Sequence, residues 1–271
     1  MMSNEGAVYG IIEAMDAYMS FAEVYDSLME DVPYDEWHKR IKRHLCENGI
    51  KDGLILDLAC GTGVMTELLA SDGYDMTGID MSPEMLEQAG IKREQSGHDI
   101  LYLCQDMREF ELYGTVRAIV CVCDSLNYIL KKDELTEVFR LVNNYLDPSG
   151  LFLFDINTVH KYRDVIGDTV IAENRDDCSF IWENFYDPDE KLNQYDLSLF
   201  IKDEESGLYR RQDETHIQRG YELKDIEEAL EASGLKLMAV YDADKSEEGK
   251  APVPVSADTE RIFVIAQESG K

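Results

Sequence analysis

The sequence has little positive charge for its length. Among 271 residues, 26 are Lys or Arg and 56 are Asp or Glu, which gives a formal net charge of −30 at pH 7. Such a surface repels phosphate backbones and anionic lipid head groups unless a local basic patch overcomes the repulsion. The densest basic stretch, residues 38–44, has the spacing of an amphipathic helix, so we interpret it as a solvated helix face that pairs with nearby acids. Neither nucleic acid nor a membrane is therefore an expected partner.

Long hydrophobic runs are also missing. No apolar run approaches the roughly 18 residues that a transmembrane helix needs. The first 18 residues carry three acids and lack the basic and apolar regions of a signal peptide. The six cysteines lie mostly in apolar, strand-like runs without a second Cys or His pair at zinc spacing, as buried thiols do in a reducing compartment. We therefore expect a cytoplasmic protein without a bound metal.

What the chain does have is a regular alternation of short apolar runs and helical spacing from residue 54 onward. Strands are predicted at 54–59, 75–80, 100–104, 116–123 and 151–156, with helices at 64–70, from Pro83 and at 133–146. Such alternation is typical of an α/β, Rossmann-like, doubly wound parallel sheet.

The pattern changes after residue 160. Four strand-like segments separated by turn residues predict a small antiparallel β insertion, and a helix at 223–232 with strands at 235–241 and 261–266 follows it. We expect an N-terminal helical cap at 1–50, a ligand-binding core at 51–160, the insertion at 161–220, and residues 221–271 completing the core sheet.

A glycine-rich segment, residues 57–63, follows the first predicted strand. Small residues at Ala59, Gly61 and Gly63 allow a ligand to approach the backbone, and the helix start offers N–H groups beyond the carboxyl end of the strand. Asp80, at the end of the second strand, can accept hydrogen bonds from both hydroxyls of a ribose. Dinucleotide-binding and S-adenosylmethionine-binding domains share this pairing of glycine turn and acid.

Two residues favour S-adenosylmethionine over a dinucleotide. A dinucleotide fingerprint has Gly or Ala at position 66, where the helix packs closely beside the pyrophosphate, whereas this chain has Thr66. Asp57 adds a carboxylate that disfavours a pyrophosphate and suits a ligand with an ammonium and a sulfonium group.

Successive segments of the chain resemble the motifs of class I S-adenosylmethionine-dependent methyltransferases. They are residues 54–63, 78–82, 105–107 and 123–128. Residues 213–219 and 260–263 further resemble a bacterial group of small-molecule-type enzymes with an antiparallel insertion after the fifth strand. This resemblance implies a seven-stranded methyltransferase sheet, S-adenosylmethionine as cofactor, and an insertion that serves as a substrate lid.

The resemblance also implies roles for individual residues. The methionine moiety would contact Asp57, Ala59, Gly61 and Gly63, and the ribose would contact Asp80. The adenine would contact Met81, Asp106 and Met107. The sulfonium would lie against the backbone of Cys123. Three aromatic residues of the N-terminal helices are further candidates near the cofactor, namely Tyr25, Tyr34 and Trp37.

The catalytic group and the acceptor are less defined. Methyl transfer mainly requires alignment and exclusion of water, so a general base is optional. Tyr25, His216 and Arg219 are the candidates, although an exposed structural histidine at 216 and a paired arginine at 219 are an equal alternative. Motifs of nucleobase and glutamine methylation are missing after the fourth strand, which favours transfer to nitrogen or oxygen of a small molecule.

Several alternatives stay open from the sequence. A magnesium site formed by Asp124, Asp155 and Asn157 is disfavoured by the spacing of the last two. The chain could instead be a methyltransferase-like cofactor-binding module without its own catalysis or, less favourably, a nucleotide-dependent oxidoreductase. The protein could be a monomer or a homodimer.

Overall fold

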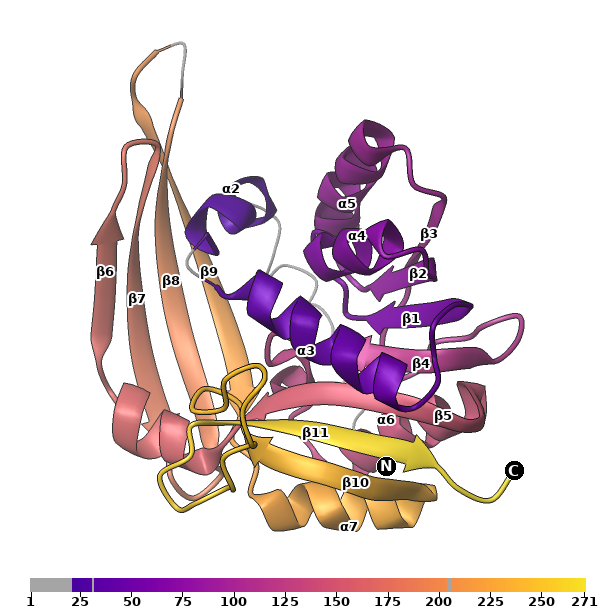
Figure 1. Ribbon diagram of the computed structural model, residues 1–271. Coiled ribbons are helices and arrows are strands. Elements are labelled where there is room, and N and C mark those ends of the chain that lie inside the picture. The colour runs from indigo at the N-terminus through magenta and orange to yellow at the C-terminus, as the bar shows by residue number, and fades with distance from the viewer. Residues whose placement is uncertain (1–20, 31, 204–205) are drawn as a thin grey trace, which may run out of the picture.

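The computed structural model describes residues 21–30, 32–203 and 206–271, which form two sheets (Figure 1). The larger sheet has seven strands in the order β10-β11-β5-β4-β1-β2-β3. Its strands are β1 (Leu54–Leu58), β2 (Asp75–Asp80), β3 (Ile100–Cys104), β4 (Val116–Cys121), β5 (Leu146–Asn157), β10 (Leu235–Asp242) and β11 (Arg261–Glu268). The first five are parallel, and β11 runs antiparallel to both β5 and β10. The Rossmann-like α/β prediction is confirmed.

Helices cover both faces of this sheet, because its central strands are apolar on both sides. One buried cluster joins the sheet to α6 (Lys132–Tyr145) and α7 (Leu223–Ser233). The other cluster joins it to α3 (Tyr34–Glu47) and α4 (Val64–Ser71). Beside α4 lies α5 (Pro83–Ser96), which begins as predicted, with Ser82 accepting a hydrogen bond from the Met85 amide at 3.2 Å.

The start of β5 differs from the prediction. The strand begins at Leu146 rather than 151, because Leu146 pairs with Val116 before the register shifts to Leu151 opposite Ala118. Residues 147–150, between the predicted helix and the predicted strand, therefore form an irregularity within β5, with Ser149 in the left-handed region at φ 64°.

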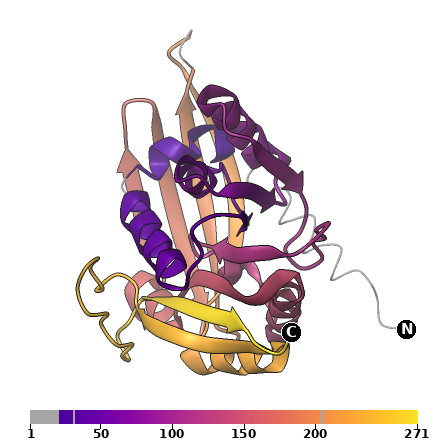
Figure 2. The same ribbon diagram turned by 45° about the vertical axis from the view of Figure 1, so that its right-hand side comes forward.

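The insertion is a four-stranded antiparallel sheet in the order β6-β7-β8-β9. Its strands are β6 (Val170–Asn174), β7 (Cys178–Asp187), β8 (Leu192–Lys202) and β9 (Tyr209–Arg219), and the one-turn π-helix η2 (Lys161–Ile166) connects it to β5. This sheet stands beside the core, with β9 on the side that faces it (Figures 1 and 2). The antiparallel insertion predicted after the fifth strand is present.

Helix α2 (Phe21–Leu28) lies between the insertion and the core in both views (Figures 1 and 2). On one side Val24 packs against Cys178 and Leu199 of the insertion. On the other side Asp26 accepts a hydrogen bond from the buried hydroxyl of Thr62, in the glycine-rich loop, at 2.6 Å. The helix thus links the two sheets. The first part of the expected N-terminal cap, residues 1–20, lies outside the described residues.

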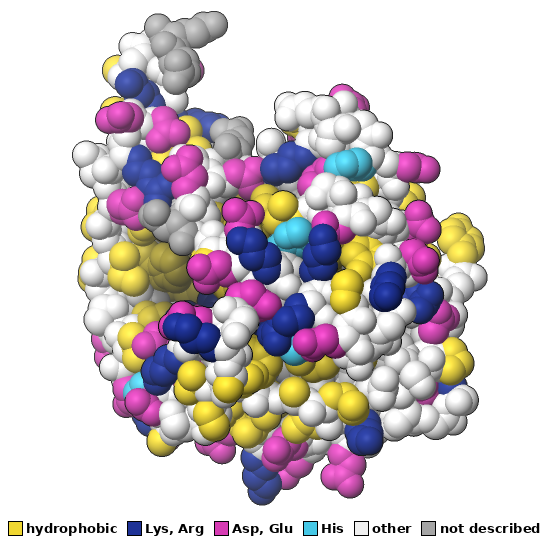
Figure 3. All heavy atoms as spheres, in the orientation of Figure 1, with side chains coloured by type: hydrophobic (Ala, Val, Ile, Leu, Met, Phe, Trp, Pro, Cys, Tyr) yellow, Lys and Arg dark blue, Asp and Glu magenta, His cyan; other side chains and the backbone are white. Residues whose placement is uncertain are grey.

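Within the part of the chain that the structure describes, no helix is long and apolar enough to cross a membrane. The stretch 38–44 lies on α3 and is only partly the solvated face that we expected, because Arg40 is buried and donates to the carbonyls of Ala243 and Ser246 at 2.9 and 2.7 Å. Other basic side chains of the stretch do pair with acids. Lys42 and His38 both contact Asp72, and Arg43 contacts Glu248 at 2.9 Å. Figure 3 shows basic and acidic side chains interspersed on this face, as expected for a solvated helix surface.

Candidate active site

A cavity of about 860 Å³ opens at the carboxyl ends of β1, β2 and β4 and extends to β9 of the insertion. This is where ligands bind in open α/β sheets, and the volume is in the range of small-molecule sites. Most of the predicted site residues line it: Tyr25, Tyr34, Asp57, Ala59, Gly61, Asp80, Met81, Asp106, Met107, Cys123 and His216.

The backbone around the cavity takes unusual conformations. Ala59 follows β1 with φ 59°, and Cys123 and Asp124 follow β4 with φ 62° and 48°. Left-handed conformations cost non-glycine residues of order 1–3 kcal/mol each and persist where the surroundings hold them, often at functional sites. Both strand ends that face the cavity therefore hold strained backbone.

Asp57 is buried at the bottom of the glycine-rich loop. Its carboxylate accepts a hydrogen bond from the Thr66 hydroxyl at 2.5 Å, one turn into α4. Burial raises the pKa of Asp57 to about 7, and the nearby Asp80 adds to the rise while the Thr66 hydrogen bond opposes it. A cationic ligand group would restore the charged form of this carboxylate.

Asp80 ties two loops together. Its carboxylate accepts hydrogen bonds from the backbone N–H of Gly61 at 2.8 Å and of Ser82 at 2.9 Å. Burial raises the pKa of Asp80, and these two N–H groups oppose that rise. Its orientation is therefore fixed beside the loop, with acceptor capacity left for a ligand hydroxyl.

These residues suit S-adenosylmethionine. Asp57 offers a carboxylate for the ammonium group, and Asp80 offers an acceptor for the ribose hydroxyls. Met81 and Met107 provide apolar surface in the same cavity for the adenine ring. The small residues Ala59 and Gly61 keep the loop backbone accessible between them.

Comparison with known proteins agrees with this geometry. Residues 55–150 match the family model described as a methyltransferase domain. The chain is 42% identical over 253 residues to YqeM of Bacillus subtilis (strain 168), which carries the name of a methyltransferase, and the match covers 93% of this chain and 97% of YqeM. The crystal structure of an S-adenosylmethionine-dependent methyltransferase from Clostridium acetobutylicum ATCC 824 is similar at a TM-score of 0.83 and 34% identity, covering 93% of this chain and 99% of that one. The chain belongs to the class I S-adenosylmethionine-dependent methyltransferases.

Three residues predicted for the site of this methyltransferase do not line the cavity. Trp37 lies behind Tyr34, with ring centroids 5.8 Å apart. Gly63, at φ 78°, immediately precedes α4, and an added side chain there would collide with Tyr102. The Arg219 side chain donates to the carbonyl of Leu130. Trp37 and Arg219 thus contact residues that line the cavity, Tyr34 and Leu130.

Asp106 and His216 both line the cavity but have protein partners. The Asp106 carboxylate accepts two hydrogen bonds at 3.0 Å from Nε of Arg108, two residues further along the chain. The His216 side chain is buried rather than exposed, with Nε2 3.4 Å from Glu214. The alternative of an exposed structural histidine is therefore wrong.

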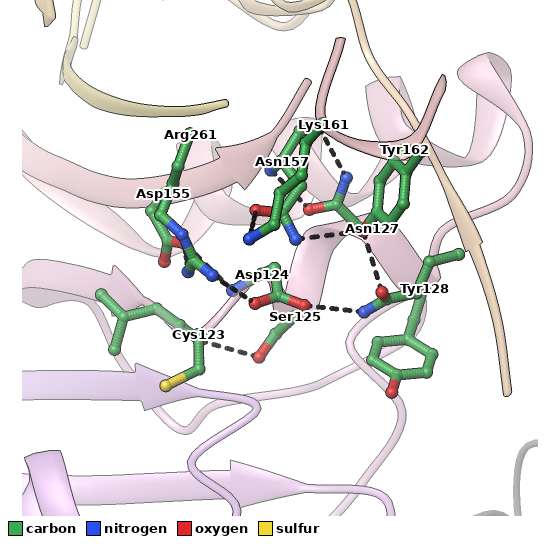
Figure 4. Close-up of polar contacts among 12 residues, drawn as sticks. Cys123, Asp124, Ser125, Asn127, Tyr128, Asp155, Asn157, Lys161, Tyr162 and Arg261 are labelled. Carbon is green, nitrogen blue, oxygen red and sulfur yellow. Dashed lines mark hydrogen bonds and ion pairs between the residues drawn. The ribbon is translucent and has the colours of Figure 1, made fainter. Parts of the chain in front are cut away.

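A buried polar cluster beside Cys123 was not predicted from the sequence (Figure 4). The Arg261 guanidinium donates to Asp124 at 3.0 Å and to Asp155, and the Trp37 ring stacks on it at 5.2 Å. The Asp155 carboxylate in turn accepts from the Asp124 backbone N–H at 3.1 Å. Arg261 therefore occupies the space between the carboxylates considered for magnesium. The sequence did contain a signal for this cluster, because Arg261 is the only basic residue in the otherwise apolar run 261–266.

The cluster continues toward the insertion. Gln218 of β9 donates to Asp124 at 2.8 Å and accepts from the Tyr162 hydroxyl at 2.8 Å. Asn127 holds Asn157 through paired hydrogen bonds of 2.9 Å (Figure 4). These contacts fix the strained turn after β4 against both sheets.

Proposed function

We propose that this methyltransferase transfers the methyl group to nitrogen or oxygen of a small-molecule acceptor. The observation that supports this is the extent of the cavity. It begins at Asp57 and Asp80, continues past Cys123, and ends against residues 213–217 of the insertion. One cavity can thus hold the cofactor and a small acceptor side by side.

In this proposal the core residues hold the cofactor. Asp57 faces the amino group, Asp80 the ribose hydroxyls, and Cys123 the sulfonium through its backbone. Methionine contacts come from Ala59 and Gly61, and adenine contacts from Met81, Asp106 and Met107. When bound, S-adenosylmethionine supplies an electrophilic methyl group, so that the protein mainly has to align the acceptor and exclude water.

The segment 161–220 would act as the lid, together with α2. Asp26 of α2 pairs with Lys92 and with Thr62, while Ser27 contacts Asp177 of the insertion at 3.4 Å. Movement of α2 away from the glycine-rich loop would therefore open the cofactor end and loosen the acceptor end together. We further propose that the protein acts in the cytoplasm, since its six cysteines are free thiols.

Methyl-labelled S-adenosylmethionine tests the proposal. The protein is incubated with a metabolite extract and, in parallel, with the protein and nucleic acid fractions of the same cells. We expect label in the small-molecule fraction. Label confined to macromolecules would contradict the proposal, and cofactor binding without any transfer would support the cofactor-binding module instead.

A further inference from the structure

We propose that Glu214, His216 and Tyr128 form a proton relay that takes a proton from an amine acceptor bound in its ammonium form. This inference rests on the proposed function and identifies the chemical class of its methyl acceptor. All three residues line the cavity, and two of them come from the insertion strand β9.

The three side chains lie in a row, with His216 in contact with both Glu214 and Tyr128. Glu214 and His216 are two residues apart on β9, so they share the buried face of that strand, with Glu214 3.4 Å from Nε2. The other ring nitrogen, Nδ1, is 3.1 Å from the Tyr128 hydroxyl. A carboxylate 3.4 Å from Nε2 favours a proton on that nitrogen, which leaves Nδ1 as the acceptor for a hydroxyl proton.

A second tyrosine fixes this arrangement. The Tyr195 ring stacks on His216, with centroids 4.8 Å apart and planes 14° apart, and its hydroxyl is 2.8 Å from that of Tyr128. If Tyr195 donates in that contact, Tyr128 donates to His216. Tyr128 itself lies just after β4, four residues from the turn at Asp124, and its hydroxyl points away from the Arg261 cluster (Figure 4).

The charge of the cavity favours an amine. Seven carboxylate side chains and two cationic ones line it. Arg108 pairs with Asp106, Lys131 with Glu134 at 2.7 Å, and Arg211 with Asp213 at 2.8 Å. The other four of the seven carboxylates are those of Asp57, Asp80, Glu109 and Glu214. An anionic acceptor would be repelled, whereas an ammonium group is attracted into a wall of excess negative charge. An ammonium nitrogen has no lone pair, so it must lose a proton before it can accept a methyl group.

The relay provides for that loss. An N–H bond of the ammonium breaks and its proton binds the Tyr128 oxygen, while the Tyr128 hydroxyl proton passes to Nδ1 of His216. The electron pair of the broken bond stays on nitrogen as the nucleophilic lone pair. Glu214 stabilises the imidazolium through Nε2, and this proton leaves to water when the cavity opens.

The first test needs no substrate. In protein labelled with ¹⁵N-histidine, the His216 signals are assigned among five histidines by their loss in His216→Gln. We expect the neutral ring to carry its proton on Nε2, and the Nδ1 resonance to shift in Tyr128→Phe. The control Tyr209→Phe, at an exposed tyrosine of the same strand, should leave the resonance unchanged. A proton on Nδ1, or an Nδ1 chemical shift that is unchanged in Tyr128→Phe, would overturn the relay.

The second test examines the product. Mass spectrometry and NMR of the labelled metabolites should place the methyl group on an amine nitrogen. Tyr128→Phe and Glu214→Gln should lower kcat about 100-fold, while Tyr209→Phe retains it. The Kd of S-adenosylhomocysteine should be unchanged in both relay variants. A methyl group on oxygen, sulfur or carbon, or an unchanged kcat, would overturn the inference. No transfer by the wild-type protein would instead refute the proposed function, and this inference with it.

Discussion

The Thr66 hydroxyl of α4 donates to the Asp57 carboxylate of β1 at 2.5 Å, across the turn that joins the two elements. Thr66 stands where a dinucleotide-binding turn has a small residue. Here its side chain fills that space and orients an acid at the base of the loop. The same position thus removes a feature of pyrophosphate binding and supports a carboxylate suited to a cation.

Cofactor affinity should depend on the ionisation of Asp57. Because burial raises the pKa of Asp57 to about 7, its carboxyl is increasingly protonated below pH 7 and can no longer pair with the cofactor ammonium. Binding of S-adenosylhomocysteine, followed by calorimetry, should weaken about fivefold between pH 7 and pH 6. Asp57→Asn should bind weakly without this dependence. Identical pH profiles for the two proteins would contradict the role of Asp57.

Asp80→Ala should weaken cofactor binding about 100-fold, because the ribose hydroxyls lose a charged acceptor. Asp75→Ala is the matched control, since Asp75 lies exposed at the other end of the same strand. Thermal unfolding of both variants shows whether the loop at Gly61 is preserved. A folded Asp80→Ala protein with unchanged affinity would refute the assignment.

Arg261→Met should destabilise the protein by about 3–5 kcal/mol, because it leaves Asp124 and Asp155 as buried carboxylates without their cation. Arg140→Met, at an exposed pair with Glu137, should change stability by less than about 0.5 kcal/mol. Urea unfolding measures both. Equal effects of the two substitutions would show that the Arg261 cluster does not hold the turn after β4.

Chelation should leave methyl transfer intact. The carboxylates of Asp124 and Asp155 face the Arg261 guanidinium, and no group of three acidic, Cys or His side chains among residues 21–30, 32–203 and 206–271 is placed to hold a metal ion. The measurement is the rate of label transfer with EDTA and with added magnesium. A rate that EDTA abolishes and magnesium restores would contradict this expectation.

Local sequence patterns were sufficient to predict the core of the fold. The apolar runs of β1, β4 and β5 and the cap at Ser82 are dictated by neighbours in the chain, and the glycine-rich loop follows from its own residues. Asp57 and Asp80 could be placed at one edge of the sheet because parallel strands bring their carboxyl ends together. The start of β5 was missed because the residues around Pro148 read as a turn, whereas pairing with Val116 extends the strand across them.

The polar contacts between the two sheets could not be predicted in this way. Gln218 reaches Asp124 across 94 positions of the chain, and Arg261 reaches Asp124 across 137. Such contacts depend on how the insertion docks on the core, which no local periodicity encodes. For the same reason His216 could be suggested as a base, but its contact with Tyr128 emerges only from the packed structure.

Isothermal titration calorimetry tests the central claim most directly, with S-adenosylhomocysteine and NAD titrated in parallel into the wild-type protein. We predict binding of S-adenosylhomocysteine at micromolar strength and no detectable binding of NAD. Binding of NAD without binding of S-adenosylhomocysteine would contradict the assignment of the cavity.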